Sequence, residues 1–403
     1  MEQRRDGVFM NTHQYKRRPN KKKRLTVLCI VLIALFAVLL AIVAGAVTFL
    51  RTYRPSLDTN GPPFVDGPND PANTGDDEPA GDVYIRDTES VNFLVAGRDK
   101  DAWNTDVMML VNFNMREGSI NVLQIPRDTY IETDGVRGRI NTMMKLKRQE
   151  AYNNDSSLSS DALMREGMKG TVESLEKSLC VQIDGYAIVN LEGFRNIIDV
   201  IGGVYMDVPF DMVYHDPYQD LNIELPKGPR VLSGAEAEMF VRFRSGFVQG
   251  DIGRVNAQKI FLTALFKQLK SNLTVTTVPA LAEQLLRYVT TDVSFADVVI
   301  YAKELLSVNM ENISMMTLPG SDARSSSTGA WYYIMHRADT LTVINEYFNV
   351  YDKPVTDEMF DVTHAFTDED YSVFANIYFA EPTDIKVEHA DDIDNSGIVI
   401  PMN

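Results

Sequence analysis

The chain has 403 residues, of which 45% are hydrophobic and 24% are charged, and its formal net charge is −17. This length is enough for one large domain or two ordinary ones with a full core. The strong acidity argues against nucleic-acid binding, and two cysteines and five histidines without ligand spacing argue against a disulfide framework or a zinc site.

The N-terminal 50 residues predict a membrane anchor. Residues 25–50 carry no charge, and a helix of that length more than crosses a hydrocarbon core of about 30 Å. Residues 1–24 hold nine lysines and arginines against two acidic residues, a net of +7, which leaves −24 for the rest of the chain. By the positive-inside rule, residues 1–24 form a cytoplasmic tail and the acidic bulk lies outside the cell membrane.

A cleaved signal peptide is the competing interpretation, because Ala44-Gly45-Ala46 resembles a cleavage site. The apolar run is longer than the roughly 7–15 residues of a signal peptide's apolar region, which favours the uncleaved anchor. Both interpretations export the rest of the chain.

Composition divides the exported part into three segments. Residues 51–82 are rich in Pro, Gly, Asp and Asn, which is typical of a flexible linker. Residues 83–352 have the patterning of a folded extracellular domain. Residues 353–403 turn acidic, and we expect them to form a loosely ordered tail.

Strand-like and helix-like segments alternate in the folded domain. Short β-rich runs bounded by Gly, Asn or Pro indicate strands at residues 91–96, 107–111, 120–125, 185–190 and 204–209. Helical periodicity and capping residues indicate helices at 161–179, 191–203, 233–240, 251–269, 279–288, 296–306 and 338–347. This order predicts an α/β domain in which a central mixed β-sheet carries helices on both sides.

Charged and amide side chains gather at the expected strand ends and on one helix face. If residues 241–244 are extended, Arg242 and Arg244 point to the same face. Helical spacing puts Asp251, Arg254 and Gln258 on one side of their helix, and we expect Lys259 on its surface. The residues at these places are Asp99, Asp106, Arg127, Asp128, Arg139, Asn141, Arg242, Arg244, Asp251, Arg254 and Gln258.

Several arginines that converge in a strongly acidic body call for a strongly anionic ligand. Arginine offers a planar fork that binds phosphate in a bidentate manner. Aspartates beside such a cluster oppose anion binding unless they hold a divalent cation that bridges phosphate oxygens. The combination indicates the binding and transfer of a phosphate group.

Each feature has a structural alternative when it is taken singly. Two nearby arginines often form a solvated face or a structural ion pair. Asp106 and Asp128 are also residues that cap turns, and Arg254 and Gln258 also suit an ordinary solvent-facing helix surface. The joint occurrence of these features favours the phosphate site.

The motifs NTDVMML, IPRDTY, RINTM, LSGAEAEMFVRFR and GDIGRVNAQ follow one another between residues 91 and 264. In order and spacing they resemble the catalytic domain of the LytR-CpsA-Psr family of cell-envelope enzymes. The resemblance implies a membrane-anchored phosphotransferase with an extracytoplasmic catalytic domain. Such an enzyme moves a glycopolymer, for example wall teichoic acid or a capsular polysaccharide, from an undecaprenyl-pyrophosphate carrier onto peptidoglycan.

The resemblance also assigns roles to residues. It implies an Mg2+ (or Mn2+) ion on Asp99 and Asp106, and catalytic roles for Asp251, Arg242 and Arg244, with Asp251 as the general base. The polyprenyl tail requires an apolar tunnel, which we expect between the sheet and the helices. The residues matching the pyrophosphate-binding set are Arg127, Arg139, Arg242, Arg244, Arg254 and Gln258.

Two positions depart from the family pattern. Asn104 stands where the family usually has arginine, and Ala257 stands where it often has a second arginine. Two alternative functions therefore stay open: a non-catalytic envelope binding or regulatory protein with the same fold, and a polyprenyl pyrophosphatase in which water replaces the acceptor.

Overall fold

The computed structural model describes residues 57, 62, 84–98, 103–133, 136–216, 221–243, 251–272, 274, 276–360 and 368–394, and for 132–133, 136, 221, 251–255 and 368–372 only the backbone. The predicted membrane helix at residues 25–50 lies outside this part of the chain, as does nearly all of the predicted linker. Among the described helices, none is long and apolar enough to cross a membrane.

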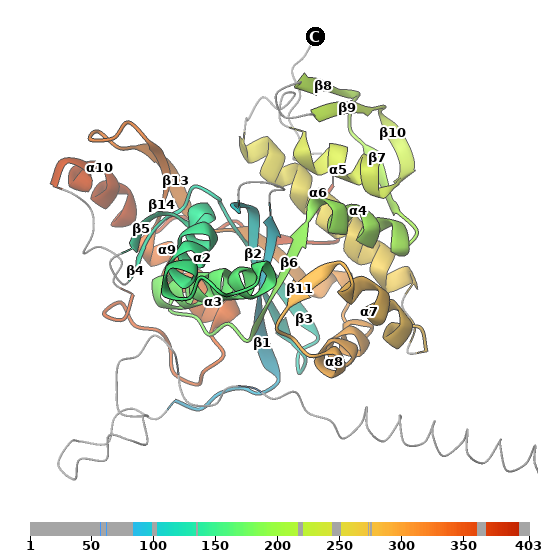
Figure 1. Ribbon diagram of the computed structural model, residues 1–403, viewed down its shortest axis with the longest axis horizontal. Helices are drawn as coiled ribbons and strands as arrows, with labels where there is room; N and C mark the ends of the chain where they lie inside the picture. The colour runs from blue at the N-terminus through green and yellow to red at the C-terminus, as the bar shows by residue number, and fades with distance from the viewer. Residues whose placement is uncertain are drawn as a thin grey trace, which may run out of the picture. The chain divides into compact units, whose positions relative to one another are not determined.

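A seven-stranded mixed sheet forms the centre of the molecule (Figure 1). Its strand order is β11-β6-β1-β2-β3-β12-β15. Neighbours β1, β2 and β3 are antiparallel, β6 runs parallel to β1, and β12 runs parallel to β3. The strands are β1 (Ser90–Arg98), β2 (Thr105–Asn114), β3 (Ser119–Ile125), β6 (Gly185–Asn190), β11 (Val289–Thr291), β12 (Ile313–Thr317) and β15 (Glu388–His389).

Both faces of this sheet are covered, as the near-continuous apolar runs in β1, β2 and β3 predict. Alternate residues such as Leu94 and Leu110 face a core shared with α2 (Met143–Asn154) and α3 (Ser160–Leu179). The opposite residues, such as Val91 and Phe113, face a core that includes side chains of α6 (Asp251–Asn272) and α8 (Phe295–Leu305). The period of two in the strands therefore divides the apolar residues between two cores.

A third apolar cluster lies to one side of the sheet, in the upper right of Figure 1. It joins the helices α4, α5 and α6 to two short antiparallel strand pairs, β7 with β10 and β8 with β9. The elements are α4 (Leu191–Val200), β7 (Val204–Val208), β8 (Met212–Asp216), β9 (Leu221–Leu225), β10 (Gly228–Leu232), α5 (Gly234–Arg242) and α6 (Asp251–Asn272).

Capping residues account for where several helices begin. Ser159, Asn190 and Ser294 accept hydrogen bonds from backbone N–H groups in the first turns of α3, α4 and α8. The predicted capping box of Ser233 with Glu236 is present and starts α5. The remaining elements are β4 (Tyr130–Thr133), β5 (Val136–Arg139), α7 (Val278–Leu286), α8 (Phe295–Leu305), β13 (Gly320–Arg324), β14 (Trp331–Met335), α9 (Arg337–Val343), α10 (Asp368–Tyr378), the 3-10 turns at Ile140–Thr142 and Met310–Asn312, and a π-helical turn at Ile344–Phe348.

The acidic C-terminal segment, expected as a loosely ordered tail, supplies two elements to the folded body. Phe374 and Tyr378 of α10 are buried in the core that α3 shares with the sheet. Strand β15 pairs antiparallel with β12 and forms the last strand of the central sheet. The acidic composition of this segment did not indicate these buried apolar residues, because the residues they pack against are far away in the sequence.

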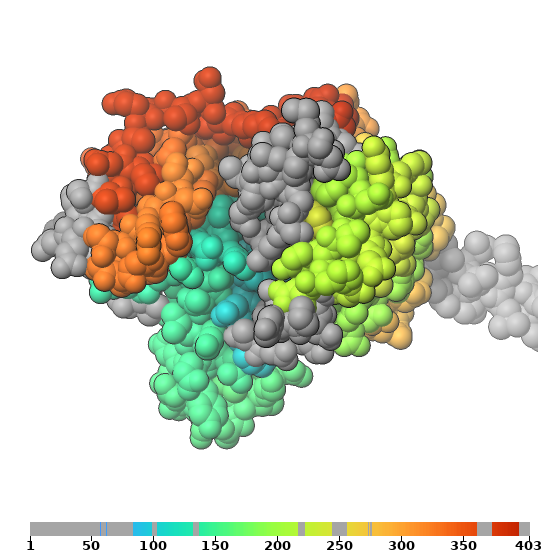
Figure 2. All heavy atoms as spheres, turned by 90° about the horizontal axis from the view of Figure 1, so that it is seen from above, coloured from blue at the N-terminus to red at the C-terminus, as the bar shows by residue number. Residues whose placement is uncertain are grey.

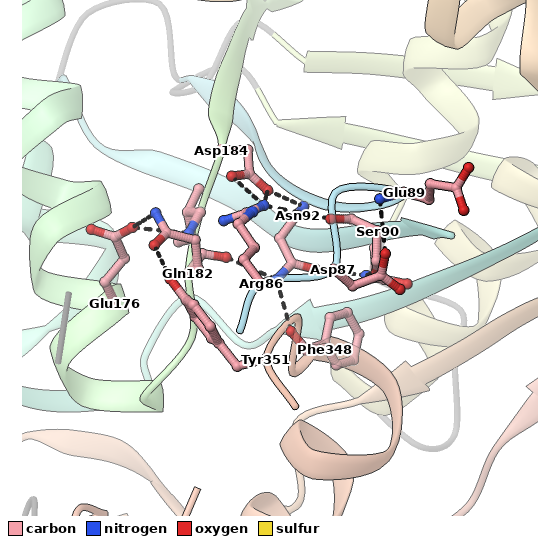
Figure 3. A network of polar contacts seen from close by, with 12 residues as sticks. Arg86, Asp87, Glu89, Ser90, Asn92, Glu176, Gln182, Asp184, Phe348 and Tyr351 are labelled. Atoms are coloured by element: carbon pink, nitrogen blue, oxygen red, sulfur yellow. Dashed lines mark hydrogen bonds and ion pairs between the residues drawn. The ribbon is translucent and has the colours of Figure 1, made fainter. Parts of the chain in front are cut away.

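A buried polar network ties the start of the described domain to the base of β1 (Figure 3). Arg86 Nη2 lies 2.7 Å from the Asp184 carboxylate, and both side chains are almost fully buried. The Asn92 amide donates to the carbonyls of Gln182 and Phe348. Three segments far apart in the chain are thereby held together at the start of β1.

Candidate functional site

The predicted polar residues of the first three strands gather at one edge of the central sheet. Parallel and antiparallel pairing brings the start of β2 and the ends of β1, β3, β6 and β12 to this edge. Ligands of open α/β sheets bind outside the carboxyl ends of the strands. Figure 2 looks down on this edge, where the blue ends of the first strands lie between the turquoise-green α2–α3 part and the yellow-green α4–α5 part.

Four charged side chains at this edge form a continuous chain of contacts. Arg127 Nη1 lies 3.2 Å from Asp106 Oδ1, and Arg127 Nε lies 3.7 Å from Asp128 Oδ2. Arg139 Nε lies 3.5 Å from the other oxygen, Asp128 Oδ1. The side chains are 31–48% exposed. Ion pairs this exposed contribute about 0–1 kcal/mol, so a multivalent anion can displace them at low cost.

The backbone around Arg127 and Asp128 is held by hydrogen bonds on both sides. The Thr129 hydroxyl donates to Pro126 O at 2.6 Å, and Asn141 N donates to Arg127 O at 3.1 Å. Tyr333 N donates to Asp128 O at 2.8 Å. The Asp128 carboxylate is bound by Arg127 and Arg139, and these backbone hydrogen bonds hold the main chain that carries Arg127 and Asp128.

Arg242 occupies a different place from the one that an extended strand predicts. It is the last residue of α5, so the premise that residues 241–244 are extended is wrong at Arg242. Its Nη1 lies 2.8 Å from Glu238 Oε1, and Arg195 of α4 binds the other oxygen of Glu238. The capping box starts α5 directly after Ser233, and the helix continues for nine residues, so it includes Arg242. Arg244 lies outside the described residues.

Helix α6 reaches the same edge of the sheet. Gln124, near the end of β3, donates from Nε2 to Gln258 Oε1 at 2.6 Å. Asp251 and Arg254 belong to the first turns of α6, but their side chains lie outside the description, and so does Asp99. Lys259, expected on the surface, is instead 8% exposed and bound to Glu388. The surface expectation for Lys259 is wrong because its partner comes from the distant C-terminal segment.

An arginine–tryptophan stack beside the edge was not anticipated from the sequence. The guanidinium carbons of Arg98 and Arg148 lie 4.6 and 4.2 Å from the centroid of the Trp103 ring. Trp103 has a φ of 56°, which is strained for a bulky residue. A tryptophan next to the expected second strand was the available signal, but Arg148 comes from α2 and only the fold brings it there.

The described residues at this edge suit a hard divalent cation. Asp106 is exposed and Arg127 contacts one of its oxygens. Asn104 Oδ1 and Asn141 Oδ1 are buried amide oxygens that find no hydrogen-bond donor among the described residues. Mg2+ typically takes one or two protein carboxylates, with waters and substrate phosphates as its other ligands. Within the described part of the chain no group of three or more His, Cys, Asp or Glu forms a complete metal cage.

Sequence comparison relates this chain to enzymes of cell-wall assembly. It is 27% identical over 230 residues to a Bacillus subtilis protein named polyisoprenyl-teichoic acid–peptidoglycan teichoic acid transferase TagV. It is 29% identical over 243 residues to the cell wall biosynthesis protein LcpA of Corynebacterium glutamicum. These matches cover 57% of this chain in both cases, and 55% and 46% of the relatives, so the chain spans about half the length of each.

Comparison of folds agrees with the sequences. The crystal structure of Bacillus subtilis TagV matches with a TM-score of 0.52 at 25% identity, over 63% of this chain and 94% of that one. A Streptococcus agalactiae protein has the same fold with a TM-score of 0.52 at 18% identity, over 64% and 86% of the two chains. The sequence profile of the LytR_cpsA_psr family matches residues 67–349, and the chain therefore belongs to the LytR-CpsA-Psr family.

Proposed function

We propose that this protein transfers a glycopolymer from a polyprenyl-pyrophosphate carrier in the membrane onto peptidoglycan. The observation that carries the proposal is the Arg127 guanidinium, preorganised at the carboxyl edge of the sheet between Asp106 and Asp128. Its weak, exposed ion pairs leave it available for phosphate. The names of TagV and of the TagU proteins of Bacillus species, which describe teichoic acid transfer to peptidoglycan, support the same reaction.

The transfer has a defined balance of bonds. An acceptor hydroxyl of peptidoglycan attacks the phosphorus that carries the glycopolymer. The P–O bond to the second phosphorus breaks, a polyprenyl monophosphate leaves, and the glycopolymer becomes joined through a phosphodiester. The hydroxyl proton passes to a base, for which we propose Asp251 at the start of α6.

The arginines stabilise the charge that moves between the two phosphates. Arg127 and Arg139 bind from the β3 side, while Arg242 binds from α5. Gln258 is oriented by Gln124 to donate from its amide nitrogen. Arg244 and Arg254 complete the proposed set by the family pattern.

We further propose an Mg2+ ion, or Mn2+, on Asp106 and Asp99. A bound cation lowers the negative charge of the pyrophosphate and orients it. The unsatisfied oxygens of Asn104 and Asn141 are suited to a water of its hydration shell. Asn104, which replaces a family arginine, contributes an acceptor where the family pattern has a donor of positive charge.

The core between α2, α3 and the sheet is a suitable place for the polyprenyl chain. Six methionines are buried in it: Met108, Met143, Met144, Met168, Met316 and Met335. Methionine is unbranched and flexible, so such a core repacks around an inserted apolar chain more readily than one of branched residues. We propose that the polyprenyl chain enters this core. We also propose that residues 25–50 span the membrane and hold the folded domain at its outer face.

Transfer by the detergent-extracted full chain tests this proposal. A synthetic polyprenyl-pyrophosphate-linked disaccharide and purified peptidoglycan serve as substrates, and sugar bound to peptidoglycan and released polyprenyl monophosphate are measured. We expect Arg127→Ala, Asp106→Ala and Arg242→Ala each to lower kcat/KM by about 10²- to 10³-fold with a nearly unchanged Tm. Arg287→Ala is the control, because Arg287 is an exposed arginine directly after α7 that is ion-paired with Glu283.

The products distinguish the competing functions. Monophosphate release without sugar on peptidoglycan indicates a pyrophosphatase. No turnover with retained lipid binding indicates an envelope binding protein. Either result overturns the transferase proposal.

A further inference from the structure

Lys259 of α6 forms a buried ion pair with the C-terminal segment. Its Nζ lies 2.7 Å from Glu388 Oε2, and the Lys259 side chain is only 8% exposed. A lysine is almost never buried this deeply without a charged partner. Glu388 lies beyond residues 67–349, the part of the chain that the family profile matches.

Glu388 is fixed to the sheet rather than carried by a free tail. In the pairing of β15 with β12, Glu388 lies opposite Met315 and His389 lies opposite Ser314. Ala390 N donates to Ile313 O at 2.8 Å, and the Ala390 side chain is fully buried. The carboxylate that meets α6 therefore stands on a rigid strand.

Three residues within two turns of α6 attach the helix to three different strands. Gln258 accepts from Gln124 of β3, and Lys259 binds Glu388 of β15. The Thr263 hydroxyl lies 3.9 Å from Met315 Sδ of β12. Successive residues of a helix point about 100° apart, so contacts at 258 and 259 in different directions fix the rotation of the helix about its axis.

Rotation of α6 bears on the proposed phosphate site, because Gln258, the residue before Lys259, meets Gln124 at the strand ends. We propose that Glu388 is a positioning residue: through Lys259 it sets the orientation of α6 and thereby holds Gln258 against Gln124 at the end of β3. The expected effect on kcat rests on the transferase proposal, whereas the orientation of α6 by the Lys259–Glu388 pair does not.

The test compares Glu388→Gln and Lys259→Met with Lys386→Ala in the detergent-extracted full chain. Lys386 Nζ also contacts Glu388, at 2.8 Å, but the Lys386 side chain is 74% exposed. Hydrogen exchange of backbone amides at 251–258 is measured without substrate, and transfer to peptidoglycan is measured separately. We expect both variants at the Lys259–Glu388 pair to speed exchange about tenfold and to lower kcat about 10- to 100-fold. Lys386→Ala should match the wild type in both.

A paired apolar replacement separates positioning from stability. Lys259→Met with Glu388→Leu removes the charges together and should restore much of the Tm, while kcat stays low because the directional contact is gone. Recovery of kcat along with the Tm, or unchanged exchange at 251–258 in the single variants, overturns the inference. If the single variants exchange faster but the wild type transfers no glycopolymer, the positioning role is supported and the transferase proposal is overturned.

Discussion

Arg127 and Arg86 show how burial separates a residue of the site from a residue of the fold. Arg127 pairs with Asp106 and Asp128 at the surface, with its side chain 31% exposed. Arg86 pairs with Asp184, with both side chains at most 3% exposed. Exposed pairs contribute about 0–1 kcal/mol, whereas breaking a buried pair costs about 3–5 kcal/mol. Substitution of Arg127 should therefore change activity, and substitution of Arg86 should change stability.

Arg86→Ala should lower the free energy of unfolding by about 3–5 kcal/mol, since it leaves the buried Asp184 carboxylate without its cation (Figure 3). Urea denaturation followed by tryptophan fluorescence measures the change. Arg287→Ala, which removes an arginine that is 67% exposed, should stay within about 0.5 kcal/mol of the wild type. An unchanged urea midpoint for Arg86→Ala would contradict the structural role.

Cys180 should be chemically inert in the folded protein. Burial raises the pKa of its thiol to about 12, so the reactive thiolate is scarce at neutral pH. Its Sγ also lies 3.3 Å from Met359 O. We expect iodoacetamide at pH 8 to leave Cys180 unmodified until the protein is unfolded in guanidinium, as mapped by peptide mass spectrometry. Rapid labelling under native conditions would show that this core opens readily.

Helix α6 and strand β15 show how an element acquires its position from a distant one. The sequence pattern predicts a long helix from residue 251, and the structure has α6 from Asp251 to Asn272. Nothing local shows that Lys259 turns inward, because its partner Glu388 lies 129 residues further on. Periodicity therefore identifies the element, and the contact with β15 decides its rotation.

The pair of Lys259 with Glu388 also predicts a pH dependence of stability. Partial burial by itself raises the pKa of the Glu388 carboxyl, but hydrogen bonds and charges from Lys259 and Lys386 outweigh it, so the pKa lies below the ordinary 4.5. A carboxyl whose pKa is lowered by folding stabilises the fold at pH values above its unfolded-state pKa. This stabilisation is lost as the pH falls through the folded-state pKa. The Tm difference between wild type and Glu388→Gln should therefore be largest above about pH 5 and shrink in more acidic solution. A Tm difference between wild type and Glu388→Gln that stays constant from pH 7 to pH 3 would argue against a lowered pKa of Glu388.

At the scale of the molecule, one sheet contributes to two cores, and the candidate site lies at one of its edges. Methionine-rich packing covers one face, and α6 and α8 cover the other. The Asp106–Arg127–Asp128–Arg139 chain lies where the ends of several strands meet, and Gln258 of α6 contacts Gln124 at the same strand ends. The candidate site residues are thus carried by elements of the packed sheet and its helices.

Removal of divalent cations should stop transfer without unfolding this rigid body. We expect EDTA to lower the transfer rate at least about tenfold, and Mg2+ or Mn2+ to restore it, because the proposed ion balances pyrophosphate charge. The Tm without substrate should hardly change, since the proposed ligand Asp106 is an exposed carboxylate and substrate phosphates would supply further ligands. Asp106→Ala should raise the Mg2+ concentration needed for half-maximal rate. Full activity in EDTA would refute the metal proposal.

The sequence by itself determined the elements whose signals are local. Strand β6 has the bounds expected for it, α3 begins one residue before its expected start, and the capping box of Ser233 and Glu236 begins α5. Period, capping and turn chemistry are set by neighbours within a few residues, so they can be inferred from the chain directly. The motif order also pointed to the family to which the profile assigns residues 67–349.

Only the tertiary structure decided which charges meet. It placed Arg242 at a helix end beside Glu238, buried Lys259 against Glu388, stacked Arg98 and Arg148 on Trp103, and gave the acidic C-terminal segment a strand in the central sheet. Each of these depends on a side chain finding a partner far away in the sequence. Such pairing follows from the packing of whole elements, which no local pattern encodes.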